Sequence, residues 1–101
     1  MKNKAINALI EMGMSAKLKG FQYIVDAMCL FNADYSTTEL YSVVAQKNNT
    51  TASRVERAIR HAFGVVLKDG VPGYVDKYLT RKHTTNGDLL HVLYLRLSQE
   101  D

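Results

Sequence analysis

The chain has 101 residues, of which 47% are apolar and 23% charged, a composition that excludes a disordered or collagen-like protein. Its length leaves no room for a second domain, so one folded domain over residues 1–101 is expected. Its single cysteine, Cys29, excludes an internal disulfide and a cysteine-based zinc site. The net charge is +3, and the stretch 47–60, with four basic residues against one acidic residue, accounts for all of it, so a polyanion such as nucleic acid is the expected partner.

A first short helix is predicted around Ile6, Leu9 and Ile10. It ends at Gly13, which suits the left-handed backbone conformation that often follows a helix. The basic start at residues 1–4 precedes this apolar stretch, but Glu11 interrupts it, so neither a secretory signal nor a membrane span is expected. Because nothing in the sequence requires an oxidising compartment, we expect a cytoplasmic protein without membrane contact.

A second helix is predicted from apolar residues spaced at three- and four-residue steps, and it ends near residues 32–34. Its apolar stripe comprises Leu18, Phe21, Ile24, Val25, Met28 and Phe31. A stripe of Met and aromatic side chains can line a cofactor site, but packing into a core explains it better, so no cofactor is expected. Cys29 lies among these residues and is expected to be another small buried hydrophobe.

A third helix is predicted to begin at Ser36-Thr37-Thr38-Glu39, which fits the capping-box pattern of a hydroxyl followed three residues later by glutamate. It presents Leu40, Val43 and Val44 to the core and ends near Lys47. Asn48 and Asn49 then provide a turn, because asparagine tolerates positive φ, and Thr50 or Thr51 caps the next helix.

The fourth helix has two distinct faces when successive residues are advanced by roughly 100°. The apolar face is a contiguous stripe made of Val55, Ile59, Ala62, Phe63 and Val66. The polar face is continuous and mostly basic, and it is made of Ser53, Arg54, Glu56, Arg57, Arg60 and His61. A helix, a short polar turn and a second helix with such a face form the helix-turn-helix arrangement, whose second helix enters the major groove of DNA.

The remaining segments carry weaker signals. Residues 69–73 form a turn cluster, and Tyr74, Val75, Tyr78 and Leu79 are spaced as in a short amphipathic helix. The basic loop at residues 80–84, which contains Lys82, is interpreted either as a second phosphate-binding edge or as an ordinary solvated loop. The last helix is capped by Thr85 and Asp88, and its core residues are Leu89, Leu90, Leu93, Tyr94 and Leu97. No stretch alternates as a strand does, so the protein is predicted to be all-α.

The residue types of the polar face suit the reading of base pairs. Arginine can donate two hydrogen bonds to guanine O6 and N7, and glutamate can accept from cytosine N4. Glu56, between Arg54 and Arg57, therefore indicates base recognition, since a face built for phosphates alone gains nothing from a carboxylate. The alternative is that Glu56 pairs with Arg60 four residues later as an ordinary surface ion pair.

Enzyme activity is not expected. His61, His83 and His91 are scattered, and no metal-binding motif or glycine-rich phosphate loop is present, so neither a metal nor a nucleotide cofactor is predicted. Cys29 lies in an apolar stripe that lacks the basic surroundings of a catalytic thiolate.

The segment TTASRVERAIRHA closely resembles the recognition helix of the stage-zero sporulation protein A effector domain, the DNA-binding half of the master response regulator of sporulation in endospore-forming Firmicutes. The segment AINALIEMGMSAKLKGFQYIVDAM resembles the first two helices of that family, and TTNGDLLHVLYLRL resembles its last helix. The resemblance thus spans nearly the whole chain.

This resemblance implies an all-helical domain of about six helices that binds a short asymmetric element of double-stranded DNA, often as tandem copies, and regulates transcription. By position, Arg54, Glu56 and Arg57 are expected to face base edges. The expected phosphate or flanking contacts are Ser53, Arg60 and His61, with Thr51 and Lys82 added from the cap and the basic loop. A homodimer on tandem sites and RNA polymerase are further implied partners.

The chain also departs from the family pattern. It contains no receiver domain, so a stand-alone domain of this kind is expected to bind DNA without control by phosphorylation. The connections before Ser36 and after Gly70 are shorter than those of the family, and Asn48 stands where an aromatic residue is expected. The competing hypothesis is a protein-interaction module, or an inhibitor carried by a mobile element, that turns the basic helix towards an acidic protein.

Overall fold

The computed structural model describes residues 1–99, and every regular element within that range is a helix, as predicted. The six helices of this range are α1 (Lys2–Glu11), α2 (Lys19–Leu30), α3 (Thr37–Lys47), α4 (Ala52–Asp69), α5 (Pro72–Tyr78) and α6 (Asn86–Ser98). The longest is α4, with 18 residues, and it includes the whole of the basic stretch after the turn.

The helix ends form where the sequence places capping residues. Ser36 and Glu39 make both hydrogen bonds of a capping box at the start of α3. The Thr51 and Thr85 hydroxyls accept from the backbone N–H groups of the third residue of α4 and α6. Gly13 has a φ of 90° and follows the end of α1, which confirms the left-handed position predicted there.

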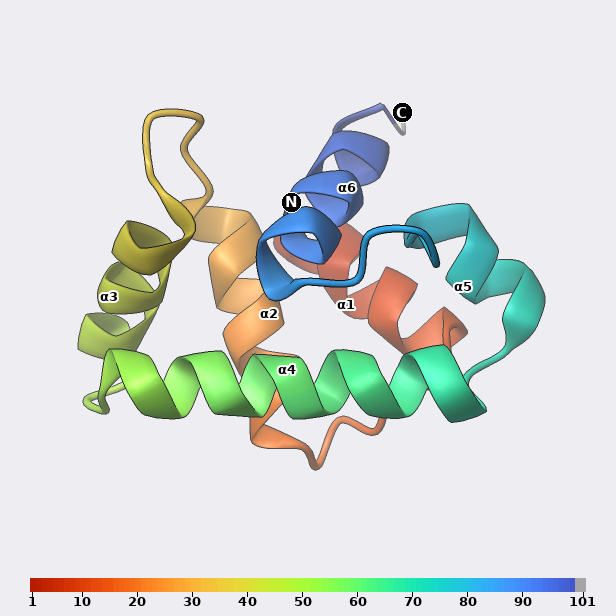
Figure 1. Ribbon diagram of the computed structural model, residues 1–101, viewed down its shortest axis with the longest axis horizontal. Helices are drawn as coiled ribbons and strands as arrows, with labels where there is room; N and C mark the ends of the chain where they lie inside the picture. Colours follow the sequence, from red (N-terminus) through yellow and green to blue (C-terminus); the bar gives the residue numbers. More distant parts are fainter. Residues whose placement is uncertain (100–101) are drawn as a thin grey trace.

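Helix α4 runs across the whole width of the molecule, with α3 at one end and α5 at the other (Figure 1). Helix α2 passes behind α4 in that view and α6 lies above it, and α2, α3 and α6 all pack against α4. The radius of gyration of 12.2 Å is close to the value of about 13 Å for a compact chain of this length. One side of α4 is thus attached to the body of the protein, and the opposite side faces solvent.

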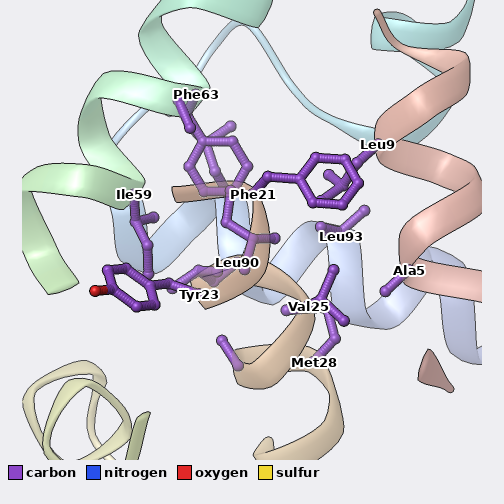
Figure 2. Close-up of a cluster of buried hydrophobic side chains, with 14 of the residues drawn as sticks. Ala5, Leu9, Phe21, Tyr23, Val25, Met28, Ile59, Phe63, Leu90 and Leu93 are labelled. Carbon is purple, nitrogen blue, oxygen red and sulfur yellow. The ribbon is translucent and has the colours of Figure 1, made fainter. Parts of the chain in front are cut away.

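The core gathers around α2, which is buried on most of its circumference. Side chains from α1, α2, α4 and α6 meet there, among them Leu9, Phe21, Ile59, Phe63 and Leu90 (Figure 2). The stripe predicted for α4 is confirmed, because Val55, Ile59, Ala62, Phe63 and Val66 are all buried. Packing of this stripe fixes the rotation of α4 about its axis and therefore fixes which residues it exposes.

Helices α2 and α4 cross at unusually short distance because Gly20 has no side chain. A Cβ atom at Gly20 would overlap the carbonyl oxygen of Ala58 and lie 2.7 Å from the Cβ of Ala62. Gly20 therefore allows the backbone of α2 to pack directly on α4, which brings the first turn of α2 beside the middle of α4.

One expectation about an individual side chain is corrected, and two apolar side chains that helped to define predicted helices are exposed. Cys29 is exposed, because it lies on the same face of α2 as Gln22, seven residues earlier, which is the solvent-facing side of that helix. Ile10 is 57% exposed, since only Leu9 and its neighbours on the opposite side of α1 enter the core. Tyr74 is exposed as well, whereas Val75, Tyr78 and Leu79 are buried as expected.

Candidate nucleic-acid interface

Helices α3 and α4 are joined by the tight turn that a helix-turn-helix requires. Asn49 adopts a φ of 51°, the left-handed conformation that asparagine tolerates. The side chain of Asn48 donates to the carbonyl oxygen of Val44 at 2.9 Å, which closes the end of α3. Thr51 then caps α4, so the chain reverses direction within a few residues and presents α4 as the second helix of the motif.

A buried carboxylate holds this turn against α2. Asp26 is only 2% exposed, and it accepts hydrogen bonds from Gln22 at 3.0 Å, Lys47 at 3.0 Å and Asn48 at 2.8 Å. Lys47 and Asn48 lie at the end of α3, so Asp26 links that end to the core helix. Local sequence patterns did not predict this network, in which Asn48 occupies the position where an aromatic was expected.

The polar face of α4 is exposed as the helical rotation predicts. Ser53, Arg54, Arg57, Arg60 and His61 are all exposed, and Glu56 is partly buried. At a rise of about 1.5 Å per residue, the segment from Ser53 to His61 is roughly 12 Å long, comparable with the width of about 12 Å of the major groove. The face is therefore of a size that one groove can accept.

Glu56 and Arg60 form an ion pair. Nη1 of Arg60 lies 2.8 Å from Oε1 of Glu56, and the side chain of Arg60 is mostly exposed. The structure thus contains the surface pair that was the alternative interpretation of Glu56. The pair engages Oε1, and Oε2 makes no hydrogen bond within residues 1–99, so the carboxylate retains a free acceptor atom.

One groove beside α4 is formed with α3. It is lined by Thr38, Tyr41, Ala52, Ser53, Glu56, Arg57 and Arg60. Burial raises the pKa of the Tyr41 phenol, and the nearby Glu56 carboxylate adds to this rise, while Asn86 and Arg60 lower it. Tyr41 therefore remains protonated at physiological pH and is available as a hydrogen-bond donor.

This side of α4 continues to the start of α6. The side chain of Asn86 donates to the carbonyl oxygen of Glu56 at 3.0 Å, and Thr84 to Gly87 line a hollow together with Glu56 and Arg60. Lys82 is exposed two residues before this segment and does not line the hollow. Its backbone N–H donates to Thr80, and its side chain makes no hydrogen bond or ion pair within the described chain.

A second groove, on the other side of α4, is formed with α2. Its lining consists of Lys19, Tyr23, Thr50, Arg54, Arg57 and Ala58, and its volume is about 490 Å³. Lys19, Tyr23 and Thr50 were not singled out in the sequence. They are brought there by the close crossing at Gly20, a tertiary contact that has no signature in the local pattern.

The cations near α4 differ in how they are engaged. Lys47, counted with the basic stretch in the sequence, is paired with Asp26, although its side chain is 54% exposed. Arg60 is paired with Glu56. Within residues 1–99, the side chains of Arg54, Arg57 and Lys19 make neither a hydrogen bond nor an ion pair. Among the basic residues of the stretch 47–60, the unpaired ones are therefore Arg54 and Arg57, at the start of α4 and beside Lys19 of α2.

Two further classes of site, membrane spans and metal centres, are absent from the described part of the chain. No helix there combines the length and the apolar character needed to cross a bilayer. The same residues hold no group of three or more histidine, cysteine, aspartate or glutamate side chains arranged to bind a metal ion.

Comparison with known families identifies the chain. The model of the family described as "Sporulation initiation factor Spo0A C terminal" matches residues 5–97. Because this match covers nearly the entire sequence, the chain belongs to that family, which confirms the resemblance seen in the sequence. The family is one of DNA-binding effector domains and not of enzymes, so double-stranded DNA is its partner at the level of the family.

Proposed function

We propose that this protein is a sequence-specific regulator of transcription that inserts α4 into the major groove of double-stranded DNA. The observation that carries the proposal is the unpaired basic face at the start of α4, where Arg54 and Arg57 are exposed and make no hydrogen bond or ion pair within residues 1–99. Arginines that are neither buried nor paired can donate both ends of the guanidinium fork to guanine O6 and N7.

Glu56 is the third base-reading residue of the proposal. Arg60 holds one carboxylate oxygen of Glu56, which orients the side chain, and the second oxygen can accept from cytosine N4. The ion pair and the base contact are therefore compatible. Glu56 would keep its ion pair with Arg60 while it accepts from cytosine. Arg60 lies near the edge of the polar face, where it could also contact a phosphate.

The remaining predicted contacts surround this centre. Ser53 and His61 lie on the same exposed face and are proposed to contact phosphate or flanking bases. Thr51 uses its hydroxyl oxygen to cap α4, which leaves its hydroxyl hydrogen as a donor. Lys82 is proposed as a more distant phosphate contact from the loop before α6.

We extend the proposal to the organisation of the protein. Residues 1–101 act as one DNA-binding domain, since helices from both ends of the chain share one core. Binding to tandem sites as a homodimer and contact with RNA polymerase follow from the family resemblance, and we propose both for a cytoplasmic regulator.

The experiment begins with selection of duplexes from a randomised library, followed by fluorescence anisotropy on the enriched duplex and on a scrambled duplex of equal composition. A preference of about a thousandfold or more, with affinity that falls as salt rises, is the expected result. Equal and weak binding to both duplexes would contradict base reading and would favour an acidic protein as the partner.

A further inference from the structure

Tyr23 has an unusual position for a buried tyrosine. The residue is only 8% exposed and its ring belongs to the core, yet its hydroxyl makes no hydrogen bond with any residue from 1 to 99. Figure 2 shows the Tyr23 ring close to Ile59, with the hydroxyl oxygen at the edge of the cluster of buried side chains. No buried side-chain nitrogen or oxygen atom of the described residues lacks a partner, so the Tyr23 hydroxyl reaches solvent at the groove and is available to a partner from outside the chain.

The place where Tyr23 reaches the surface is the groove between α2 and α4, which contains no acidic side chain. Its charged residues are Lys19, Arg54 and Arg57, and none of the three makes an ion pair within the described residues. The groove on the α3 side differs, because Glu56 there neutralises Arg60. Negative charge is therefore favoured on the α2 side.

The apolar part of the same groove is made by the Tyr23 ring and Ala58. A nucleotide of the DNA backbone likewise has a charged part and an apolar part, since its phosphate carries one negative charge and its sugar presents an apolar edge. The close crossing at Gly20 keeps the two helices at fixed separation, so the groove exists before any ligand binds.

We infer that this groove binds one phosphodiester of the DNA backbone at the edge of the major groove. The Tyr23 hydroxyl donates a hydrogen bond to a non-bridging phosphate oxygen, and Lys19 supplies the opposite charge. Arg54 and Arg57 lie on both the groove and the base-reading face, so the bound phosphate belongs to the strand that flanks α4. The inference rests on the proposed function and adds Lys19 and Tyr23 as its positioning contacts.

The test compares Tyr23→Phe and Lys19→Gln with the unaltered protein by anisotropy on the selected and scrambled duplexes over a series of salt concentrations. Tyr23→Phe removes one hydrogen bond to a charged group, so we expect about tenfold weaker binding to both duplexes with an unchanged salt slope. Lys19→Gln should weaken both and reduce the slope of log K against log salt by about 0.9.

A second arm uses selected duplexes in which one phosphate at a time is replaced by a neutral methylphosphonate. At one position the replacement should weaken the unaltered protein about tenfold and have little further effect on Tyr23→Phe, because the hydrogen bond is already absent. Thermal melting of both variants accompanies the measurements. Lys19 is exposed, so Lys19→Gln tests the charge without a risk to folding.

Tyr74→Phe and Lys2→Gln are the matched controls, since both residues are exposed and neither lines the groove. The inference would be overturned if Tyr23→Phe bound both duplexes with unchanged affinity. It would also be overturned if the slope of log K against log salt fell as much for Lys2→Gln as for Lys19→Gln. If the unaltered protein prefers the selected duplex, and Tyr23→Phe and Lys19→Gln bind both duplexes with the affinities of the unaltered protein, only the proposed phosphate site is contradicted. If the unaltered protein binds neither duplex, the proposed function itself fails.

Discussion

The side-chain nitrogen of Asn48 lies 2.8 Å from a carboxylate oxygen of Asp26, and this contact joins the turn before the DNA-binding helix to the most buried helix of the protein. Lys47 donates to the other oxygen of Asp26 at 3.0 Å. The orientation of α3 and of the turn therefore depends on one buried charge that is satisfied by partners from two helices.

Replacement of Asp26 by alanine is expected to lower the free energy of unfolding by about 2 kcal/mol, because the donors at Gln22, Lys47 and Asn48 lose a charged acceptor. For a domain of this size the melting temperature should fall by roughly 10 °C. Chemical denaturation measures the free energy of unfolding, and thermal melting measures the melting temperature. Asp34→Ala is the control, since Asp34 is exposed, and an equal loss in both variants would contradict the role of Asp26.

Two glycines in helices should respond to alanine in opposite directions. Gly20→Ala places a methyl group against the Ala58 carbonyl and is expected to destabilise the protein by about 1–3 kcal/mol. A Cβ at Gly64, within α4, would meet no atom within 4 Å, so Gly64→Ala should stabilise the protein by about 0.5–1 kcal/mol through helix propensity. Unfolding in urea compares the two variants, and a Gly20→Ala variant as stable as the unaltered protein, or more stable, would refute the close crossing.

Local sequence patterns predicted the helices well, because the features that define them act over a few residues. The capping box at Ser36, the positive φ at Gly13 and the buried stripe of α4 all depend on neighbours within one or two turns. Cys29 was wrongly expected to be buried, since α2 is covered on most sides and its one exposed face is set by where the other helices pack.

The candidate site was predictable only in part. The exposure of Arg54 and Arg57 followed from the rotation of α4, since the apolar stripe fixes the opposite face. Asp26, Lys19 and Tyr23 were missed because their roles arise from contacts between helices far apart in the chain. A buried aspartate in an otherwise apolar stretch is the one signal that could have drawn attention to Asp26.

Arg54→Ala is expected to cost about 1–3 kcal/mol of binding free energy on the selected duplex and to relax specificity at one base pair. Lys82→Ala should weaken all sequences alike if its loop reaches a phosphate, and should lower the salt slope by about one. Anisotropy on selected and scrambled duplexes separates these results. Equal losses on both duplexes for Arg54→Ala would remove it from the base-reading set.

Glu56→Ala gives the sharpest test of how α4 recognises DNA, because the two interpretations of its carboxylate predict different results. The ion pair with Arg60 is a surface pair at i,i+4, so its loss should change the free energy of unfolding by no more than about 0.5 kcal/mol. If Glu56 also accepts from cytosine, binding to the selected duplex should weaken by about 1–3 kcal/mol.

Binding of Glu56→Ala to the scrambled duplex should instead strengthen, since a negative charge that faces phosphates is removed and Arg60 is released. Asp69→Ala removes a negative charge from the other end of α4, outside the polar face, and is expected to leave the ratio of the two affinities unchanged. Glu56 acts only as the partner of Arg60 if Glu56→Ala strengthens binding to both duplexes by the same factor. A fall on the selected duplex with a rise on the scrambled one assigns the carboxylate to a base, because charge alone cannot change the two affinities in opposite directions.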